Sequence, residues 1–281
     1  MVTRTFIPGN EWLYLKIYTG IKTSDIILEE AIRPLTEYLQ ENNLISQWFF
    51  IRYTDPKPHL RLRFRLSTVL HYNEVLEQIN TALQEYAGSG EISDIVIGTY
   101  TRELERYGQH TIEDAETLFF VHSEFTLQCL DYDDEEKIII SLFYMDELFN
   151  KIDIPVQEKL RWIKAYNDAF KKEFNADKRL NSQLDKKYRD FKIKYRDFIH
   201  SEEFSEERNT VIAAVNAGDI AFRNSCQTLG NQSSELSLQH FFQSIFHMNI
   251  NRIFISSQRL FEMVIYDFLL RHYKAEVYHA G

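Results

Sequence analysis

Hydrophobic residues in the first hundred positions follow two different periods. Apolar and aromatic runs at residues 12–18 (WLYLKIY), 48–53 (WFFIRY) and 95–99 predict strands, and residues 59–66 (HLRLRFRL) alternate strictly between polar and apolar. Helical spacing predicts two helices, at residues 23–42 and 69–85. We expect Ser24 or Asp25 to cap the first helix and Pro34 to kink or split it. This order of elements, βαββαβ, is the ferredoxin-like arrangement.

From residue 111 onward the pattern is almost entirely helical. Predicted helices cover residues 112–130, 135–149, a segment opened by Pro155, 177–199, and two segments between 236 and 273 interrupted near 247–251. Residues 213–234 are small and polar and are predicted to hold the main loop. The chain is therefore predicted to be α+β, with a ferredoxin-like βαββαβ region packed on a larger, mostly helical C-terminal region. We expect one domain over residues 1–281, with an α+β part at 1–110 and a helical part at 111–281.

Composition narrows the function classes. The 281 residues are 44% hydrophobic and carry a net charge of −10, which is ordinary for a globular protein and argues against direct nucleic-acid binding. No apolar run is long enough to predict a membrane span. Cys129 and Cys226 lack metal-ligand spacing, so we expect reduced thiols in a cytoplasmic protein. Phosphate-loop, HExxH, GxSxG and CxxC motifs are all absent from the sequence, and we expect no cofactor and no metal.

A local excess of positive charge interrupts this acidic chain. Side chains alternate along a strand, so Arg61, Arg63 and Arg65 share one face while Leu60 and its apolar partners take the other. Planar guanidinium groups suit a carboxylate or phosphate in bidentate geometry. The alternative is a solvated face whose charges discourage pairing of strand edges.

Two further polar clusters follow. In residues 100–108 (YTRELERYG), a helical turn makes Glu103 a neighbour of both Arg106 and Tyr107, and the alternative is an ordinary helical ion pair. In residues 246–252 (FHMNINR), His247 stands among apolar residues. A histidine can donate or accept a proton near neutral pH, and the alternative is a satisfied core residue.

Three segments together carry a family resemblance: residues 48–64 (WFFIRYTDPKPHLRLRF), 100–108 (YTRELERYG) and 247–252 (HMNINR). In this order they resemble the thiopeptide-type bacteriocin biosynthesis domain, which is the C-terminal, glutamate-elimination domain of class I lantibiotic dehydratases. The resemblance spans nearly the whole chain. The long N-terminal glutamylation region of full-length dehydratases is absent from this sequence, so we expect a stand-alone member of a split dehydratase.

The resemblance implies a carbon–oxygen lyase of lanthipeptide or thiopeptide biosynthesis. A partner glutamylating subunit that uses glutamyl-tRNA would esterify Ser or Thr of a ribosomal precursor peptide, which consists of a leader and a core. The elimination domain would then remove glutamate to leave dehydroalanine or dehydrobutyrine.

The resemblance also implies roles for individual residues. Catalytic roles fall on Arg61, Arg63, Glu103, Arg106 and His247, and substrate-binding roles on Arg52, Arg102, Tyr107 and Arg252. The direction of proton transfer at His247 stays open. Gln109 stands where many relatives have a second glycine, a departure that we expect to affect only loop geometry.

Two other functions compete with elimination. One is a pyridine synthase-like cyclase that joins two dehydroalanines in thiopeptide maturation, and the other is a non-catalytic subunit that binds the leader peptide. The arginine cluster favours elimination, because developing carboxylate and enolate charge needs preorganised cations. The precursor peptide, the leader-binding segment and the oligomeric state are left open by the sequence.

Overall fold

The computed structural model describes residues 2–230 and 237–280 and divides the chain into two compact units. The first unit combines Met1–Asp131 with Gln227–Ser256, and the second combines Tyr132–Cys226 with Ser257–Gly281. A late segment of the chain thus belongs to the first unit, and the expected subdivision between residues 110 and 111 stays a prediction. That the whole chain acts as one domain stays a prediction.

The sheet of the first unit has four antiparallel strands in the order β3-β4-β2-β5. They are β2 (Trp12–Thr19), β3 (Ile45–Tyr53), β4 (His59–Leu66) and β5 (Ile92–Gly98). With the helices between them, these strands confirm the predicted βαββαβ order and the α+β class. β4 begins and ends where the strict alternation does, because that pattern suits an extended strand with one apolar face.

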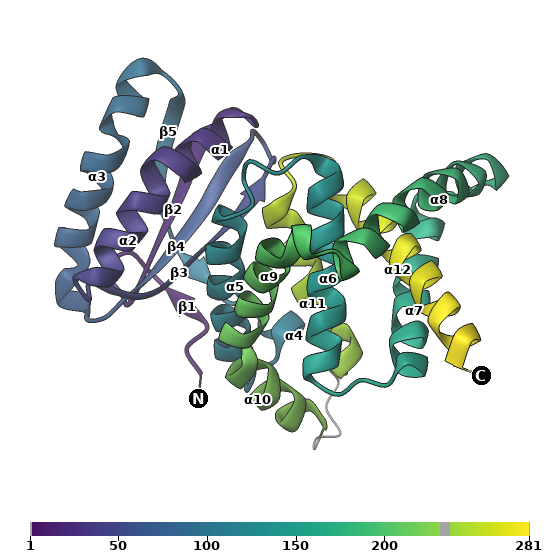
Figure 1. The fold of residues 1–281 in the computed structure, drawn as a ribbon. Coiled ribbons are helices and arrows are strands. Elements are labelled where there is room, and N and C mark those ends of the chain that lie inside the picture. Colours follow the sequence, from purple (N-terminus) through teal and green to yellow (C-terminus); the bar gives the residue numbers. More distant parts are fainter. Residues whose placement is uncertain (1, 231–236, 281) are drawn as a thin grey trace. The chain divides into compact units, whose positions relative to one another are not determined.

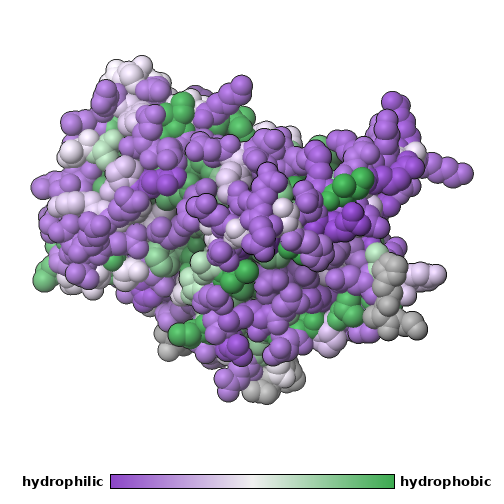
Figure 2. Space-filling view, in the orientation of Figure 1, coloured by the Kyte–Doolittle hydropathy of each residue, from purple (hydrophilic) through white to green (hydrophobic). Residues whose placement is uncertain are grey.

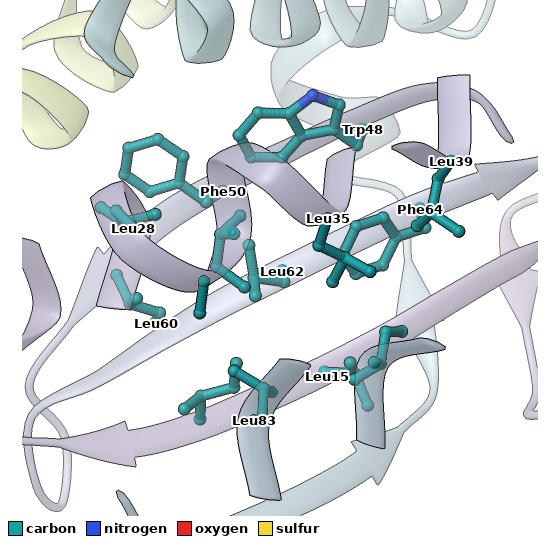
Figure 3. Packing of buried hydrophobic residues seen from close by; sticks show 14 of the residues in the cluster. Leu15, Leu28, Leu35, Leu39, Trp48, Phe50, Leu60, Leu62, Phe64 and Leu83 are labelled. Carbon is teal, nitrogen blue, oxygen red and sulfur yellow. The ribbon is translucent and has the colours of Figure 1, made fainter. Parts of the chain in front are cut away.

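One face of this sheet is buried under helices. Three helices lie across the strands in Figure 1: α1 (Thr23–Ile27), α2 (Arg33–Glu41) and α3 (Tyr72–Ser89), the last preceded by the short turn η2 (Val69–His71). Leu60, Leu62 and Phe64 of β4 pack in this layer with Leu35 and Leu83 of the helices (Figure 3). Burying each such side chain stabilises the fold by about 1.5–3 kcal/mol. The apolar face thereby fixes β4 and presents its arginines on the opposite face.

The first helical segment runs through Pro34 without a break but changes its hydrogen bonding beforehand. A π-helical turn, η1 (Leu28–Ile32), joins α1 to α2. Proline lacks an N–H and its ring crowds the preceding turn, so a wider π turn accommodates it. The predicted cap at Ser24 or Asp25 is wrong, because the helix begins without a side-chain cap and both side chains contact Arg52 instead.

Shorter elements and two longer helices complete the first unit. They are β1 (Thr5–Phe6), β6 (Tyr100–Thr101), α4 (Leu104–Tyr107), α5 (Ile112–Leu127) and α11 (Leu238–Ile253). Helices α5 and α11 pack against β3 and against each other. The predicted interruption near residues 247–251 is wrong, since α11 is continuous there. Asn251 directs its amide to the backbone of β3, so it does not compete for the hydrogen bonds of its own helix.

The described part of the second unit is helical. Its elements are α6 (Asp134–Lys151), α7 (Val156–Glu173), α8 (Lys178–His200), η3 (Glu202–Phe204), α9 (Ser205–Ala217), α10 (Asp219–Gly230, up to Cys226 in this unit) and α12 (Gln258–Ala280). A buried polar cluster joins three of them. Asp146 of α6 accepts hydrogen bonds from Lys159 Nζ of α7 at 2.7 Å and from the Tyr273 hydroxyl of α12 at 2.8 Å.

The main loop predicted at residues 213–234 is wrong over its described part. Helices α9 and α10 extend through it to Gly230, with Gly218 between them. Val211, Val215 and Phe222 are buried and supply the packing that makes these polar stretches helical. Residues 231–234 of that prediction lie outside the described residues.

The surface shows no membrane-spanning feature in the described part of the chain. None of the helices there is both long and apolar enough to cross a bilayer. Hydrophilic side chains cover most of the face seen in Figure 2, and hydrophobic ones form small separate patches.

Candidate active site in the first unit

Arg63 is the most enclosed of the three arginines on the open face of the sheet. Its register neighbours are Tyr14 on β2 and Phe49 on β3. Its guanidinium carbon lies 4.7 Å from the ring centroid of Tyr14 and 5.1 Å from that of Phe49. Tyr100 adds a third ring at 4.9 Å, and Arg63 is only 9% exposed. Aromatic faces attract a cation, but they do not neutralise it.

A glycine makes room for this arrangement. Gly98 of β5 is the register partner of Tyr14, and a Cβ atom added at Gly98 would come within 3.2 Å of two Tyr14 ring carbons. Any larger residue would require the Tyr14 ring to shift by a few tenths of an ångström. Because Gly98 has no side chain, the Tyr14 ring can lie over β5 and still contact Arg63.

The charge of Arg63 has no carboxylate partner among the described residues. The arginines of the site motifs that do form ion pairs are Arg52, Arg102 and Arg106. Burial lowers the pKa of Arg63, because desolvation disfavours a charged guanidinium, while Tyr100, Tyr14 and, less strongly, Glu103 oppose the shift. Arginine nevertheless stays protonated near neutral pH. An anion that reached this side chain would compensate the cost of its burial.

A cavity of about 40 Å³ opens beside Arg63. Its polar lining comes from Arg63, Tyr100, Thr101, Glu103 and Tyr107, and its apolar lining from Phe49, Ile51, Ile112, Phe119 and Met248. A single water needs roughly 10–15 Å³ of such space. The cavity thus has room for a small group such as one carboxylate, and a peptide would have to lie outside it.

The short helix α4 brings three predicted site residues together. Glu103 stands just before it, and Arg106 Nη1 lies 3.5 Å from Glu103 Oε2. The Arg106 guanidinium carbon lies 5.6 Å from the ring centroid of Tyr107, a buried residue whose pKa is raised by desolvation. Gly108 ends the helix at a φ of 78°, which glycine adopts readily. Glu103 and Tyr107 line the cavity with Arg63, and Arg106 contacts both of them.

Arg61 and His247 lie on elements that reach the cavity but are not among its lining residues. Arg61 lies two residues before Arg63 on the same face of β4, with its guanidinium carbon 3.5 Å from the ring centroid of Tyr53. His247 is half-buried on α11, directly before the lining residue Met248.

Arg52 and Arg102 have partners inside the fold. Arg52 Nη2 lies 2.6 Å from Asp25 Oδ1, on the face of the sheet covered by helices. Arg102 binds the fully buried Glu116 through two nitrogens, at 2.8 Å and 2.6 Å. The Tyr100 hydroxyl donates to the same carboxylate at 2.7 Å, so this pair also orients one ring around Arg63. Both arginines hold elements together, and neither lines the cavity.

Arg252 and its neighbour Asn251 satisfy the outer edge of β3. The amide of Asn251 accepts from Arg52 N at 2.9 Å and donates to Arg52 O at 3.0 Å. Arg252 Nε donates to Phe50 O at 2.8 Å. Unpaired backbone groups on a buried strand edge are costly, so these side chains replace a missing neighbour strand. The last two residues of the HMNINR segment, Asn251 and Arg252, therefore hold α11 against the edge of β3.

Sequence reasoning missed the aromatic surroundings of Arg63. Tyr14, Phe49 and Tyr100 belong to segments recognised as strands or motifs, but nothing in the sequence said which rings would meet which arginine. Strand order and register were the missing signals, because cross-strand neighbours are set by pairing.

Two other features bear on the choice of site. Within the described residues, no group of three or more His, Cys, Asp or Glu side chains is arranged to hold a metal ion. A larger cavity, of about 600 Å³, lies among α6, α8 and α12 of the second unit and contains none of the predicted site residues.

Comparison with known proteins decides the family. The family model described as "Lantibiotic biosynthesis dehydratase C-term" matches residues 12–273. The chain belongs to this family. Among curated relatives of this dehydratase domain, the nisin biosynthesis protein NisB of Lactococcus lactis subsp. lactis is 37% identical over 123 residues, which are 43% of this chain and 12% of NisB. The subtilin biosynthesis protein SpaB of Bacillus subtilis is 26% identical over 67% of this chain and 19% of SpaB. The chain thus corresponds to less than a quarter of either relative.

Solved structures agree on the fold of this lantibiotic dehydratase C-terminal domain. The tRNA-dependent lantibiotic dehydratase MibB from Microbispora sp. 107891 matches all of this chain with 29% of its own, at a TM-score of 0.74 and 21% identity. TbtD, a pyridine synthase from thiomuracin biosynthesis, matches 97% of this chain with 100% of its own, at a TM-score of 0.62 and 12% identity. At these identities the likeness concerns the fold, which can serve more than one reaction.

Proposed function

We propose that this domain catalyses β-elimination of glutamate from glutamylated Ser or Thr of a ribosomal precursor peptide. The observation that carries the proposal is the unpaired, buried Arg63 at a cavity of carboxylate size. In this reaction a base removes the α-proton, its electron pair forms the Cα=Cβ double bond, and the Cβ–O bond breaks. Glutamate leaves as a carboxylate, and the peptide keeps dehydroalanine or dehydrobutyrine.

The chemistry of the site suits this charge flow. Negative charge develops on the enolate and on the departing carboxylate, and a preorganised cation in a partly dry site stabilises both. We assign the departing carboxylate to Arg63, with Arg106 beside it. Glu103 orients Arg106 across the 3.5 Å contact, and Tyr107 forms part of the wall. Arg61 contributes a second cation on the same face, and His247 is the residue that we assign to proton transfer.

The family relationship supports a role in dehydration chemistry on a precursor peptide. NisB is named as a nisin biosynthesis protein, SpaB as a subtilin biosynthesis protein, and MibB as a tRNA-dependent lantibiotic dehydratase. We therefore propose that a glutamylating partner using glutamyl-tRNA supplies the substrate of this domain. Binding of the tRNA itself is not required of an acidic chain with a net charge of −10.

The test is mass spectrometry of a glutamylated precursor peptide incubated with the protein. Loss of glutamic acid, with a dehydrated residue left in the peptide, is the expected result. The Arg63→Met variant should leave the glutamylated peptide unchanged over the same time.

The pyridine synthase named in the comparisons defines the main competing outcome. If the glutamylated peptide stays unchanged and a peptide that already carries two dehydroalanines is cyclised, the proposed reaction becomes cyclisation and elimination is rejected. Binding of the peptide without either product would make the domain a leader-binding subunit.

A further inference from the structure

Glu116 on α5 is a fully buried carboxylate that takes no part in the reaction proposed above. It is absent from the described residues that line the cavity beside Arg63. Its Oε1 accepts hydrogen bonds from the Tyr100 hydroxyl at 2.7 Å and from Arg102 Nε at 2.8 Å. Its Oε2 accepts from Arg102 Nη2 at 2.6 Å. These three hydrogen bonds, two of them from a cation, hold the carboxylate in one orientation.

Arg102 is itself fixed, so the position of Glu116 does not depend on a single contact. Arg102 Nη1 donates to Thr3 O at 3.0 Å, and the guanidinium carbon lies 5.0 Å from the ring centroid of Phe6. Breaking a buried ion pair leaves an uncompensated charge, so such a pair rarely opens. The oxygen of Glu116 that accepts from Tyr100 therefore stays in a fixed place.

The Tyr100 ring connects this ion pair to Arg63. Its centroid lies 4.9 Å from the Arg63 guanidinium carbon and 5.4 Å from the centroid of Trp12, which meets it edge-on at 66°. The hydroxyl of the same residue donates to Glu116. Burial raises the pKa of Tyr100, and the negative charge of Glu116 raises it further. The hydroxyl thus stays protonated near neutral pH as a donor to Glu116, and it is not free to transfer a proton.

We propose that Glu116 is a positioning residue that acts on Arg63 through the Tyr100 ring. The proposal rests on the function proposed above, in which Arg63 stabilises the departing carboxylate. A ring held against one side of a guanidinium group excludes water there, and a cation in a drier site stabilises developing negative charge more strongly. Without the hydrogen bond from its hydroxyl, the Tyr100 ring can turn away and admit water to Arg63. Glu116 thus promotes the reaction without contacting the substrate.

Chemical modification tests the positioning without requiring turnover. The full chain is treated with phenylglyoxal, which reacts with accessible guanidinium groups, and chymotryptic cleavage after Phe64 separates Arg63 from Arg65 for mass spectrometry. Glu116→Gln keeps an oxygen that can accept from Tyr100 but removes the charge that holds this oxygen in place. We expect Arg63 to react about tenfold faster in this variant than in wild type, because losing a charge-assisted contact makes local opening more frequent. Arg65, measured in the same sample, should react at an unchanged rate.

Two further variants separate positioning from a general loosening of the fold. Tyr100→Phe keeps the ring and removes only the hydroxyl, and should raise the rate of Arg63 modification about threefold. Asp25→Asn is the matched control, because it removes the carboxylate partner of Arg52, a second buried arginine of the same unit. This control lies on the helix-covered face of the sheet and should leave the rate of Arg63 modification unchanged.

The rate of glutamate release shows whether this positioning serves the reaction. Glu116→Gln should lower kcat about tenfold and change KM by less than about twofold, because Glu116 does not contact the substrate. In an Arg63→Met background, the same substitution should slow the reaction by less than about twofold, since the residue that it positions is gone. A role in stability alone would give the same fold-change in both backgrounds.

The outcomes separate this proposal from the proposed function. Unchanged Arg63 modification in folded Glu116→Gln and Tyr100→Phe overturns the positioning, and so does an equal increase in Asp25→Asn. If Glu116→Gln does not fold, Tyr100→Phe alone decides between these results. A normal kcat in variants with faster modification overturns the role of Glu116 in the reaction. Faster modification in these variants, when even the wild type releases no glutamate, keeps Glu116 as the residue that positions Tyr100 and rejects elimination.

Discussion

The two faces of the sheet in the first unit are built from the same strands but differ in whether a buried arginine has an ion-pair partner. On the helix-covered face, β4 contributes Leu62 and Phe64 to the core, and the buried Arg52 has Asp25 as its partner. On the open face, Arg63 is buried among aromatic rings and forms no ion pair with a described residue, although Glu103 lines the same cavity. A buried cation that merely stabilised the fold would have a partner, as Arg52 does. This difference is the reason for proposing that the open face receives an anion.

The largest expected effect is a loss of folding stability when the core under the helix-covered face is disrupted. Phe64→Ala should lower the free energy of unfolding by about 3–5 kcal/mol, because it removes a fully buried ring from the core. Urea titration followed by tryptophan fluorescence measures the loss. Arg65→Ala, the next residue and on the other face, should change the same quantity by less than about 0.5 kcal/mol. Equal losses of unfolding free energy in the two variants would contradict the conclusion that only the helix-covered face stabilises the fold.

The next effect acts on the open face alone. Arg63→Met should slow glutamate release by about 10²–10³-fold, the usual cost of losing one stabiliser of developing negative charge. The melting temperature should stay the same or rise, since an uncompensated buried charge is replaced by an apolar side chain of similar length. Rate measurements with circular dichroism melting test both halves. A strongly destabilised variant would show that Arg63 supports the fold.

A smaller effect concerns the paired arginine. Asp25→Asn keeps the shape of the side chain but leaves Arg52 without its counter-charge, and should cost about 1–3 kcal/mol of unfolding free energy. Glutamate release should be unchanged, because this pair lies on the face away from the cavity. A rate loss with intact stability would place Arg52 in substrate binding after all.

The smallest effect is a pH dependence at His59. Its pKa is lower in the folded protein than in the unfolded chain, so the unfolded state binds more protons below about pH 6.5. The contribution of His59 to stability is therefore complete above that pH and is lost as the pH falls. His122, whose pKa burial also lowers, adds a parallel loss. Unfolding titrations between pH 5 and 7 should show a shallower slope for His59→Gln than for wild type, and identical slopes would contradict the neutral state of His59.

Much of the fold followed from local patterns. The four strands and their βαββαβ order were predictable because an apolar residue at every second position suits only an extended strand with one buried face. Helix breaks were less predictable. Polar residues at 247–251 and 213–234 suggested interruptions, yet α11 and, up to Gly230, α9 and α10 are helical there. The buried faces of these helices and the outward bonds of Asn251 outweigh local propensity.

The sequence by itself determined that the arginines of β4 lie on one face of the strand and the apolar residues on the other. Only the tertiary structure decided which arginines have partners. Arg52, Arg102 and Arg252 were expected to bind substrate and Arg63 to act in catalysis, but the fold supplies Asp25, Glu116 and the edge of β3 to the first three. The hydrogen bonds that satisfy these side chains join segments up to 202 positions apart. Periodicity reports local geometry and carries no information about contacts across that distance.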